Sequence, residues 1–279
     1  MTVQLLHLAD LHFGGVADIR QIEALEQIIP DLRPDAVVVS GDVAQRARHG
    51  EFQRARAFVQ RALETAPVYI LPGNHDVQWW WRPFLPFGKD ALYTKYRRYF
   101  GEELTPTMEL PGALLTGVLT SHGLSFASIT QFRDPTVKGH LPKREIARVR
   151  GIFARAPADA ARVLVVHHNV LRGDISQRMG LARWRTAQQR ILESGADVVL
   201  CGHDHQEGAD VLGGRVVVST TGTLSVRTRG GRPSCFNFVT IESSAVQVTF
   251  FRWESEHGRF RASDTFAFAR ERHGVPVTV

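Results

Sequence analysis

The chain has 279 residues, 43% of them hydrophobic, and carries 34 Lys and Arg against 28 Asp and Glu, with a sequence pI of about 9.8. This length and composition suffice for a sizeable core and exclude a low-complexity chain. The arginines are scattered along predicted helices and are not interleaved with aromatic residues. We therefore expect a solvated basic surface and do not favour a nucleic-acid interface.

Apolar runs and cysteines bear on the compartment. No apolar run approaches the length of a membrane span, and because the first predicted strand begins at residue 3, we expect no signal peptide before it. Cys201 and Cys235 lie in apolar, strand-like runs and are expected to be buried, reduced thiols. Together these features predict a cytoplasmic protein with no membrane span.

The first 76 residues predict a parallel α/β unit. Short apolar, β-branched runs predict strands at 3–9, 36–40 and 67–71. Apolar residues at helical spacing predict helices at 19–29 and 52–63. Asp18 is the expected N-cap of the first helix and Pro30 its expected end. Such alternation of strand and helix is typical of a parallel sheet.

The alternation is interrupted after residue 76. Segment 77–110 is expected to be an insertion that borders the site, and it opens with Trp79-Trp80-Trp81. These tryptophans either pack against a sheet edge or a homodimer seam, or they line the substrate pocket. Later strands are predicted at 113–118, 124–130, 162–166, 197–201, 215–219, 236–241 and 246–251, the last three in a second sheet, with helices at 143–153 and 184–192. We expect one domain over 1–279, with 254–279 as a C-terminal tail.

Polar side chains that can bind metal follow five of the predicted strands. They form the motifs Asp10-Leu-His12, Gly41-Asp42, Gly73-Asn74-His75-Asp76, His167-His168 and Gly202-His203-Asp204-His205. The carboxyl ends of strands in an α/β sheet border a crevice where ligands bind. Imidazole, carboxylate and amide groups without thiolate favour Mn, Fe, Zn, Co or Ni. Seven candidate ligands are too many for one tetrahedral ion and fit two ions that share a carboxylate.

These five motifs, in this order, resemble the signature of the calcineurin-like metallophosphoesterase superfamily, and the resemblance extends over residues 7–205. It implies an α/β fold, a four-layer α/β/β/α sandwich of two mixed β-sheets flanked by helices. It also implies a ligand set. One metal ion would be held by Asp10, His12 and His205, and the other by Asn74, His167 and His203, with Asp42 bridging the two.

The resemblance further implies catalytic roles. His75 is expected near the scissile ester, where it stabilises the developing charge or protonates the leaving oxygen, with Asp76 orienting its ring. His168 is expected beside the substrate and not as a metal ligand. Many relatives carry Pro after this histidine pair, whereas Asn169-Val170 follows here, so the local loop is less predictable. Substrate contacts are also predicted for Trp79, Arg133 and His140.

The predicted chemistry is hydrolysis of phosphate esters by hydroxide that forms at two divalent ions. The run from Leu192 to His205 is similar to the bacterial cyclic-nucleotide phosphodiesterase branch, which favours cyclic nucleotides or other small phosphodiesters as substrates. Three alternatives stay open. They are a nuclease acting on DNA or RNA, a phosphomonoesterase, and a catalytically inactive metal-binding scaffold.

Overall fold

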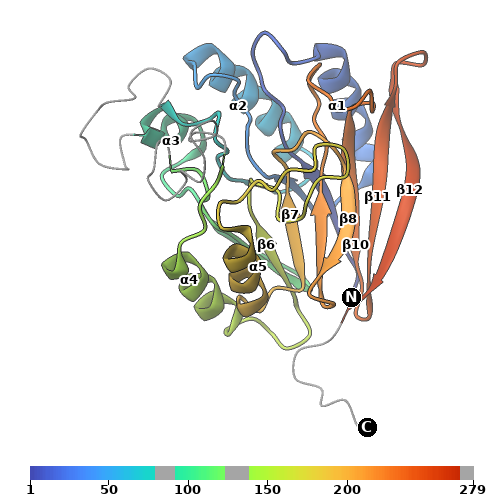
Figure 1. Ribbon diagram of the computed structural model, residues 1–279. Coiled ribbons are helices and arrows are strands. Elements are labelled where there is room, and N and C mark those ends of the chain that lie inside the picture. The colour runs from blue at the N-terminus through green and yellow to red at the C-terminus, as the bar shows by residue number, and fades with distance from the viewer. Residues whose placement is uncertain (79–91, 123–137, 271–279) are drawn as a thin grey trace.

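The computed structural model describes residues 1–78, 92–122 and 138–270 (Figure 1). Two six-stranded sheets form its centre. Predictions for Trp79, Arg133 and the strand at 124–130 lie outside the described residues. Among the described residues, no helix is both long and apolar enough to cross a membrane.

The first sheet has the strand order β12-β11-β10-β1-β2-β3. Its strands are β1 (Val3–Leu8), β2 (Ala36–Val39), β3 (Val68–Ile70), β10 (Cys235–Ile241), β11 (Ala245–Glu254) and β12 (Arg259–Ala269). Strands β1, β2 and β3 are parallel, as predicted, whereas β10 pairs antiparallel with β1. Assigning β10 and β11 to the second sheet was therefore wrong. The expected tail from residue 254 was also wrong in part, because β12 pairs with β11 along the edge of this sheet.

The second sheet has the order β4-β5-β6-β7-β9-β8. Its strands are β4 (Thr107–Leu110), β5 (Ala113–Gly117), β6 (Ala161–Val165), β7 (Val198–Cys201), β8 (Gly208–Leu212) and β9 (Val216–Thr220). Four central strands are parallel, and the edge strands β4 and β8 are antiparallel to their neighbours. Part of the expected insertion at 77–110 thus belongs to the sheet as β4.

The described helices are α1 (Ile19–Leu32), α2 (His49–Leu63), α3 (Thr94–Phe100), α4 (Lys143–Phe153) and α5 (Trp184–Glu193). The Asp18 side chain accepts a hydrogen bond from the backbone N–H of Arg20, which confirms it as the N-cap of α1. Pro30 does not end α1. It lies in the last turn, where it removes one backbone hydrogen bond of the helix, but the helix continues to Leu32 before Arg33 turns left-handed.

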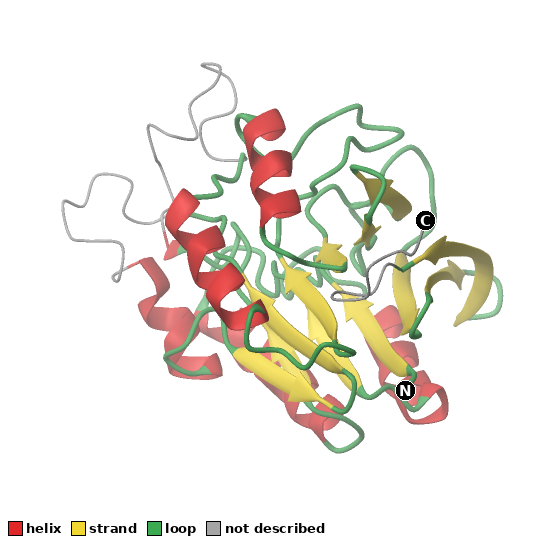
Figure 2. Ribbon diagram, turned by 90° about the horizontal axis from the view of Figure 1, so that it is seen from below, coloured by secondary structure: helices red, strands yellow, loops and turns green. Residues whose placement is uncertain are grey.

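Three apolar cores define the layers. The first packs α1, α2 and α3 against the outer face of the first sheet. The second fills the space between the sheets, and the third packs α4 and α5 against the second sheet. Helices accordingly lie on the outer sides of the two sheets (Figures 1 and 2). The predicted four-layer α/β/β/α sandwich is confirmed, and Cys201 and Cys235 are buried within it, as expected.

Candidate metal centre

The motif loops of the two sheets meet at the carboxyl ends of their parallel strands. Asp10 follows β1, and its backbone N–H donates to the carbonyl of Gly41 after β2, at 3.0 Å. In the second sheet, the N–H of Gly202 after β7 donates to the carbonyl of His167 after β6, at 2.9 Å. Parallel neighbours end at the same edge of a sheet, so five dispersed motifs converge on one place.

The backbone at this place is strained. Five of the seven predicted ligands have positive φ, which costs a residue with a side chain about 1 kcal/mol or more. They are Asp10 (53°), His12 (46°), Asp42 (54°), His203 (73°) and His205 (56°). Residues hold such conformations only where their surroundings enforce them, and these outliers cluster at functional sites.

Three glycines allow the loops to approach closely. Each directly precedes a predicted ligand, and each would carry its Cβ into another motif. A Cβ on Gly41 would lie 2.6 Å from Nδ1 of His167, and one on Gly202 would lie 2.7 Å from Oδ2 of Asp10. A Cβ on Gly73 would lie 2.7 Å from the carboxyl carbon of Asp42 and closer still to its Oδ1. Glycine at these positions is therefore a packing requirement.

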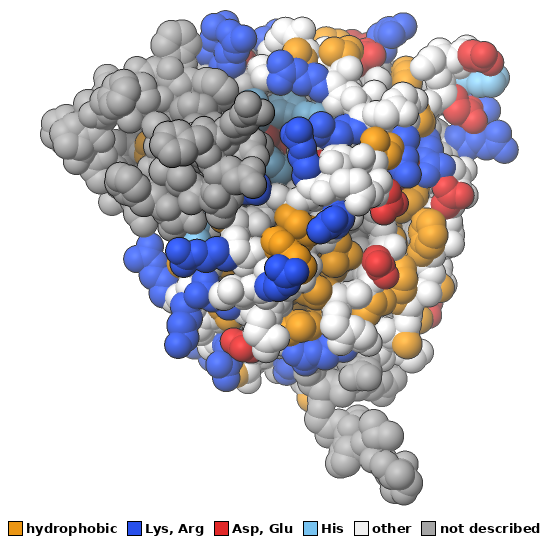
Figure 3. Space-filling view, viewed as in Figure 1, with side chains coloured by type: hydrophobic (Ala, Val, Ile, Leu, Met, Phe, Trp, Pro, Cys, Tyr) orange, Lys and Arg blue, Asp and Glu red, His pale blue; other side chains and the backbone are white. Residues whose placement is uncertain are grey.

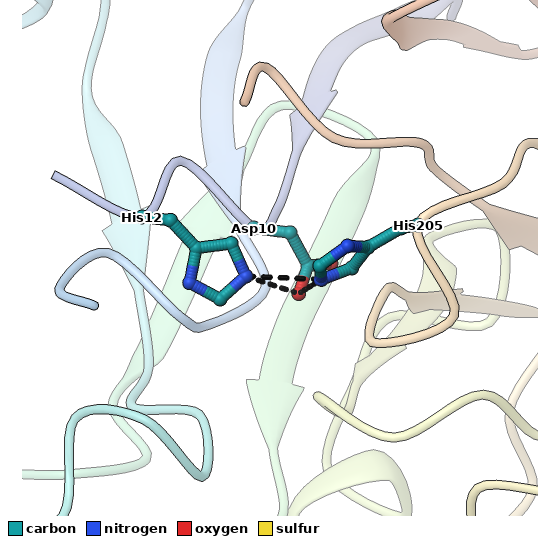
Figure 4. A group of neighbouring side chains, drawn as sticks. All are labelled: Asp10, His12 and His205. Carbon is teal, nitrogen blue, oxygen red and sulfur yellow. Dashed lines mark hydrogen bonds and ion pairs between the residues drawn. The ribbon is translucent and has the colours of Figure 1, made fainter. Parts of the chain in front are cut away.

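The first ligand group consists of Asp10, His12 and His205, which point toward one another (Figure 4). Nε2 of His12 lies 2.9 Å from Nε2 of His205, and these atoms lie 3.6 Å and 3.3 Å from Oδ1 of Asp10. That oxygen is buried and has no hydrogen-bond partner among the described residues. Ligands about 2.1 Å from one cation lie roughly 3.0–3.4 Å apart. The three atoms therefore fit a shared metal ion, which would satisfy the lone pairs now facing one another.

The second group lies next to it and comprises Asp42, Asn74, His167 and His203. Oδ1 of Asn74 lies 3.0 Å from both Nε2 of His167 and Nδ1 of His203. Oδ2 of Asp42 lies 3.3 Å from Nε2 of His167 and 4.0 Å from Nε2 of His12 in the first group. One carboxylate oxygen thus lies between the two groups.

Backbone carbonyls fix the orientation of two of the imidazoles. Nδ1 of His167 bonds to the carbonyl of Ser40 at 2.9 Å, and Nδ1 of His205 bonds to the carbonyl of Arg227 at 2.8 Å. A carbonyl can only accept, so both Nδ1 atoms carry protons and both Nε2 atoms are directed at the ligand groups. This is how metal-binding histidines are usually held.

The electrostatics also suit cations. Burial lowers the pKa of His12 to about 3, so its ring is neutral at physiological pH and can bind metal. Burial disfavours the charged form of Asp42, but His167 and His75 hold the pKa of this carboxyl well below its usual range. Burial of His167 is likewise outweighed by Asp42, which raises the pKa of the imidazole to about 9. A divalent cation bound by this pair would take the place of that proton.

His75 borders both groups. Its backbone N–H donates to Oδ1 of Asp42 at 2.8 Å, and its ring centre lies 4.8 Å from that of His12. Its Nδ1 bonds to the carbonyl of Gln45 at 2.8 Å. The half-buried ring is therefore oriented with Nε2 as its remaining polar atom, at the edge of the predicted centre.

The predicted role of Asp76 as the partner of His75 is wrong. Its carboxylate is fully buried and accepts hydrogen bonds from the backbone N–H groups of Ala44 (2.8 Å), Gly73 (2.9 Å) and Val43 (3.2 Å). The side chain points to the loop after β2, so the carbonyl of Gln45 orients His75 instead. Asp76 ties together the two loops that carry Asp42 and Asn74.

Of the four predicted substrate contacts, the structure describes His168 and His140. His168 is buried, with its ring 4.4 Å from that of His203 and its Nδ1 2.8 Å from Oγ1 of Thr120. The segment with His140 packs beside it, because the N–H of His140 donates to the carbonyl of Thr120 at 2.9 Å. Trp79 and Arg133 lie outside the described residues.

The sequence analysis missed the residues whose hydrogen bonds orient the imidazoles of the centre. Ser40, Gln45 and Arg227 act through their carbonyl groups, which no side-chain pattern reveals. His7 could have been noticed in the sequence, because it places an imidazole within an otherwise apolar strand. It is buried between the sheets, with Nε2 3.0 Å from Oγ of Ser40 and Nδ1 3.1 Å from Oγ of Ser219. Burial lowers its pKa to about 3, so it is a neutral hydrogen-bonding link.

Comparison with curated proteins agrees with these motifs. The chain is 29% identical over 219 residues to a cAMP/cGMP dual specificity phosphodiesterase of Mycobacterium tuberculosis, covering 72% of this chain and 61% of that protein. It is 39% identical over 87 residues to a glycerophosphodiester phosphodiesterase of Enterobacter lignolyticus, covering 26% of this chain and 29% of that one. The chain thus spans less than two thirds of the length of either relative.

Solved structures share the fold at low sequence identity. A purple acid phosphatase from yellow lupin (Lupinus luteus) matches with a TM-score of 0.67 and 12% identity, over 97% of this chain and 54% of that one. A dimetal phosphatase from Danio rerio matches with a TM-score of 0.65 and 11% identity, over 96% and 99%. Residues 3–207, which include every motif of the two ligand groups, match the family described as calcineurin-like phosphoesterase. The chain belongs to this family, as the motifs predicted.

Proposed function

We propose that this chain hydrolyses phosphodiesters at a centre of two divalent metal ions. The observation that carries the proposal is the position of Asp42. Its Oδ2 lies 3.3 Å from Nε2 of His167 in the second group and 4.0 Å from Nε2 of His12 in the first. A shared carboxylate is how enzymes hold two ions close enough to act on one phosphoryl group. Asp10, His12 and His205 would hold one ion, and Asn74, His167 and His203 the other.

When bound, the ions supply hydroxide near neutral pH and positive charge for the phosphoryl oxygens. His75 supplies what the ions lack, a proton for the leaving oxygen. With Nδ1 fixed on the carbonyl of Gln45, its Nε2–H in the protonated ring is the group that can reach the ester. Asp42 accepts the backbone N–H of His75 and so couples the position of this acid to the centre.

Small phosphodiesters, cyclic nucleotides among them, are the substrate class that we propose. The named activities of the mycobacterial and enterobacterial relatives support a diester over a monoester. The donor set of imidazole, carboxylate and amide supports Mn, Fe, Zn, Co or Ni as the ions. Cytoplasmic residence and a homodimer stay predictions.

The test uses metal-stripped protein supplied with each of the five metals in turn. Its substrates are bis-p-nitrophenyl phosphate, p-nitrophenyl phosphate, 3′,5′-cyclic AMP, and single-stranded and duplex DNA. We expect turnover of the diesters, lost in Asp42→Asn together with bound metal. Asp31→Asn, at an exposed position near the end of α1, is the control and should behave as wild type.

The other outcomes favour the alternatives. Faster turnover of p-nitrophenyl phosphate than of any diester would indicate a phosphomonoesterase, and degradation of DNA a nuclease. Two bound ions without turnover of any of these substrates would indicate a metal-binding scaffold and would refute the proposal.

A further inference from the structure

A cavity of about 270 Å³ opens beside the second ligand group. His203 lines it, so the cavity shares a wall with the predicted centre. Its other lining residues include Arg178, Met179 and Trp184, in and after the loop that follows β6, and Arg229 in the loop that precedes β10. Figure 3 shows histidine side chains within a hollow on this face, with Lys and Arg side chains beside it.

The charge of the cavity is predominantly positive. Among the described residues, Lys138, Arg178 and Arg229 line it, together with one acidic residue, Asp204. The carboxylate of Asp204 is already engaged, because its Oδ2 accepts hydrogen bonds from Ser176 and its Oδ1 lies 3.5 Å from Nε of Arg229. Arg178 is exposed and forms no ion pair with any other described residue. The cavity therefore has positive charge left for an anion.

The loop that carries Arg178 is built into the fold. Asn169 is buried, and its Nδ2 donates to the carbonyls of Leu171 (2.8 Å) and Arg178 (3.1 Å). The N–H of Gly173 also donates to the carbonyl of Arg178, at 3.2 Å. Gly180 is needed nearby, because a Cβ there would lie 2.8 Å from the backbone N of Asn169. Asn169 therefore fixes the loop that brings Arg178 to the cavity.

From these positions we propose that the cavity binds a second phosphoryl group of the substrate, one that is not cleaved. The proposal rests on the phosphodiesterase activity argued above. A diester at the centre can reach the cavity past His203, while Trp184 and Met179 provide an apolar wall for the organic link between the two phosphoryl groups. The preferred substrate is then a linear diester with a terminal phosphate, such as a 5′-phosphorylated dinucleotide. A cyclic mononucleotide has one phosphoryl group and leaves the cavity unfilled.

The experiment compares two dinucleotides that differ only in the terminal phosphate, pApA and ApA, on the metal-loaded protein. Binding is measured by calorimetry and turnover as kcat/KM. We expect pApA to exceed ApA by about tenfold or more, the effect of a hydrogen bond to a charged group that is partly exposed to solvent. Arg178→Ala should remove most of this preference and Arg178→Lys should retain part of it. Arg172→Ala is the matched control, because Arg172 belongs to the same loop but does not line the cavity.

The outcomes separate the two proposals. If both dinucleotides are cleaved but with equal kcat/KM, or if Arg178→Ala leaves the ratio unchanged, the cavity does not bind the phosphate and the phosphodiesterase proposal stands. If neither is cleaved but pApA binds more tightly through Arg178, the cavity assignment stands and the phosphodiesterase proposal fails. Equal loss of preference in Arg172→Ala would also overturn the assignment, since it would show a general effect of surface charge.

Discussion

Replacing Gly73 by Ala should dismantle the second ligand group without changing any ligand. The added Cβ would lie 2.7 Å from the carboxyl carbon of Asp42, whereas carbon atoms in contact are normally about 3.5–4.0 Å apart. Either Asp42 or the loop after β3 must therefore move by about 1 Å. Both carry predicted ligands, so no relaxation leaves the group intact.

The size of this shift sets the expected loss. Metal–ligand distances tolerate deviations of about 0.2 Å, and a misplacement of about 1 Å at a reacting centre costs on the order of 10²-fold in rate. We expect Gly73→Ala to bind fewer than two ions per chain and to lose at least about 10²-fold in kcat for bis-p-nitrophenyl phosphate.

Elemental analysis of the purified variant and steady-state kinetics measure the two effects. Gly151→Ala is the control, because Gly151 lies in α4 with open space around its Cβ position. Alanine in a helix is more stable than glycine by about 0.5–1 kcal/mol, so this variant should be fully active. A Gly73→Ala protein with two ions and turnover within a few-fold of wild type would refute the close approach of the two loops.

Three further predictions follow from the site and the core. His75→Ala should keep both ions and lose about 10²–10⁴-fold in kcat, and loss of metal by elemental analysis would refute its role as an acid. Chelation should lower the midpoint of thermal unfolding by about 10 °C, because two ions, each at 100 times its Kd, add roughly 5 kcal/mol to the free energy of unfolding. An unchanged midpoint would mean that no ion binds strongly. Burial raises the pKa of Cys201 to about 11 and that of Cys235 well above its usual range. At pH 8 a thiol reagent should therefore label neither cysteine until guanidinium unfolds the protein. Rapid labelling of the native protein would contradict the burial of these two thiols.

The sequence predicted which polar side chains lie together better than it predicted which strands pair in each sheet. The carboxyl ends of strands can be identified from the sequence, because an apolar run that stops just before Asp10 or His203 indicates both the strand and its polar end. Parallel strands then bring such ends together. Which strands pair with each other cannot be identified in this way. β10 pairs with β1 across 230 or more residues, and the alternating pattern of β10 identifies a strand without identifying its neighbour.

The error on Asp76 has a different physical origin. Adjacency to His75 favoured a carboxylate–histidine pair, but consecutive side chains in a turn point in different directions. Three backbone N–H groups of the neighbouring loops need an acceptor, and Asp76 supplies it. A buried carboxylate that satisfies backbone donors looks the same in a sequence as one that orients a ring.

Both ligand groups draw on both sheets. Asp10 and His12 follow the first sheet and meet His205 from the second, while Asn74 from the first meets His167 and His203 from the second. Five of the seven predicted ligands, Asp42 among them, have left-handed backbone conformations, at a summed cost of about 5 kcal/mol, comparable with the whole free energy of unfolding of many domains. Cations bound between the sheets would offset that cost only when both sheets are in register, because neither sheet alone completes a group. Metal binding and packing of the two sheets should therefore be coupled, with the apo protein weakest at the rim where the strained loops meet.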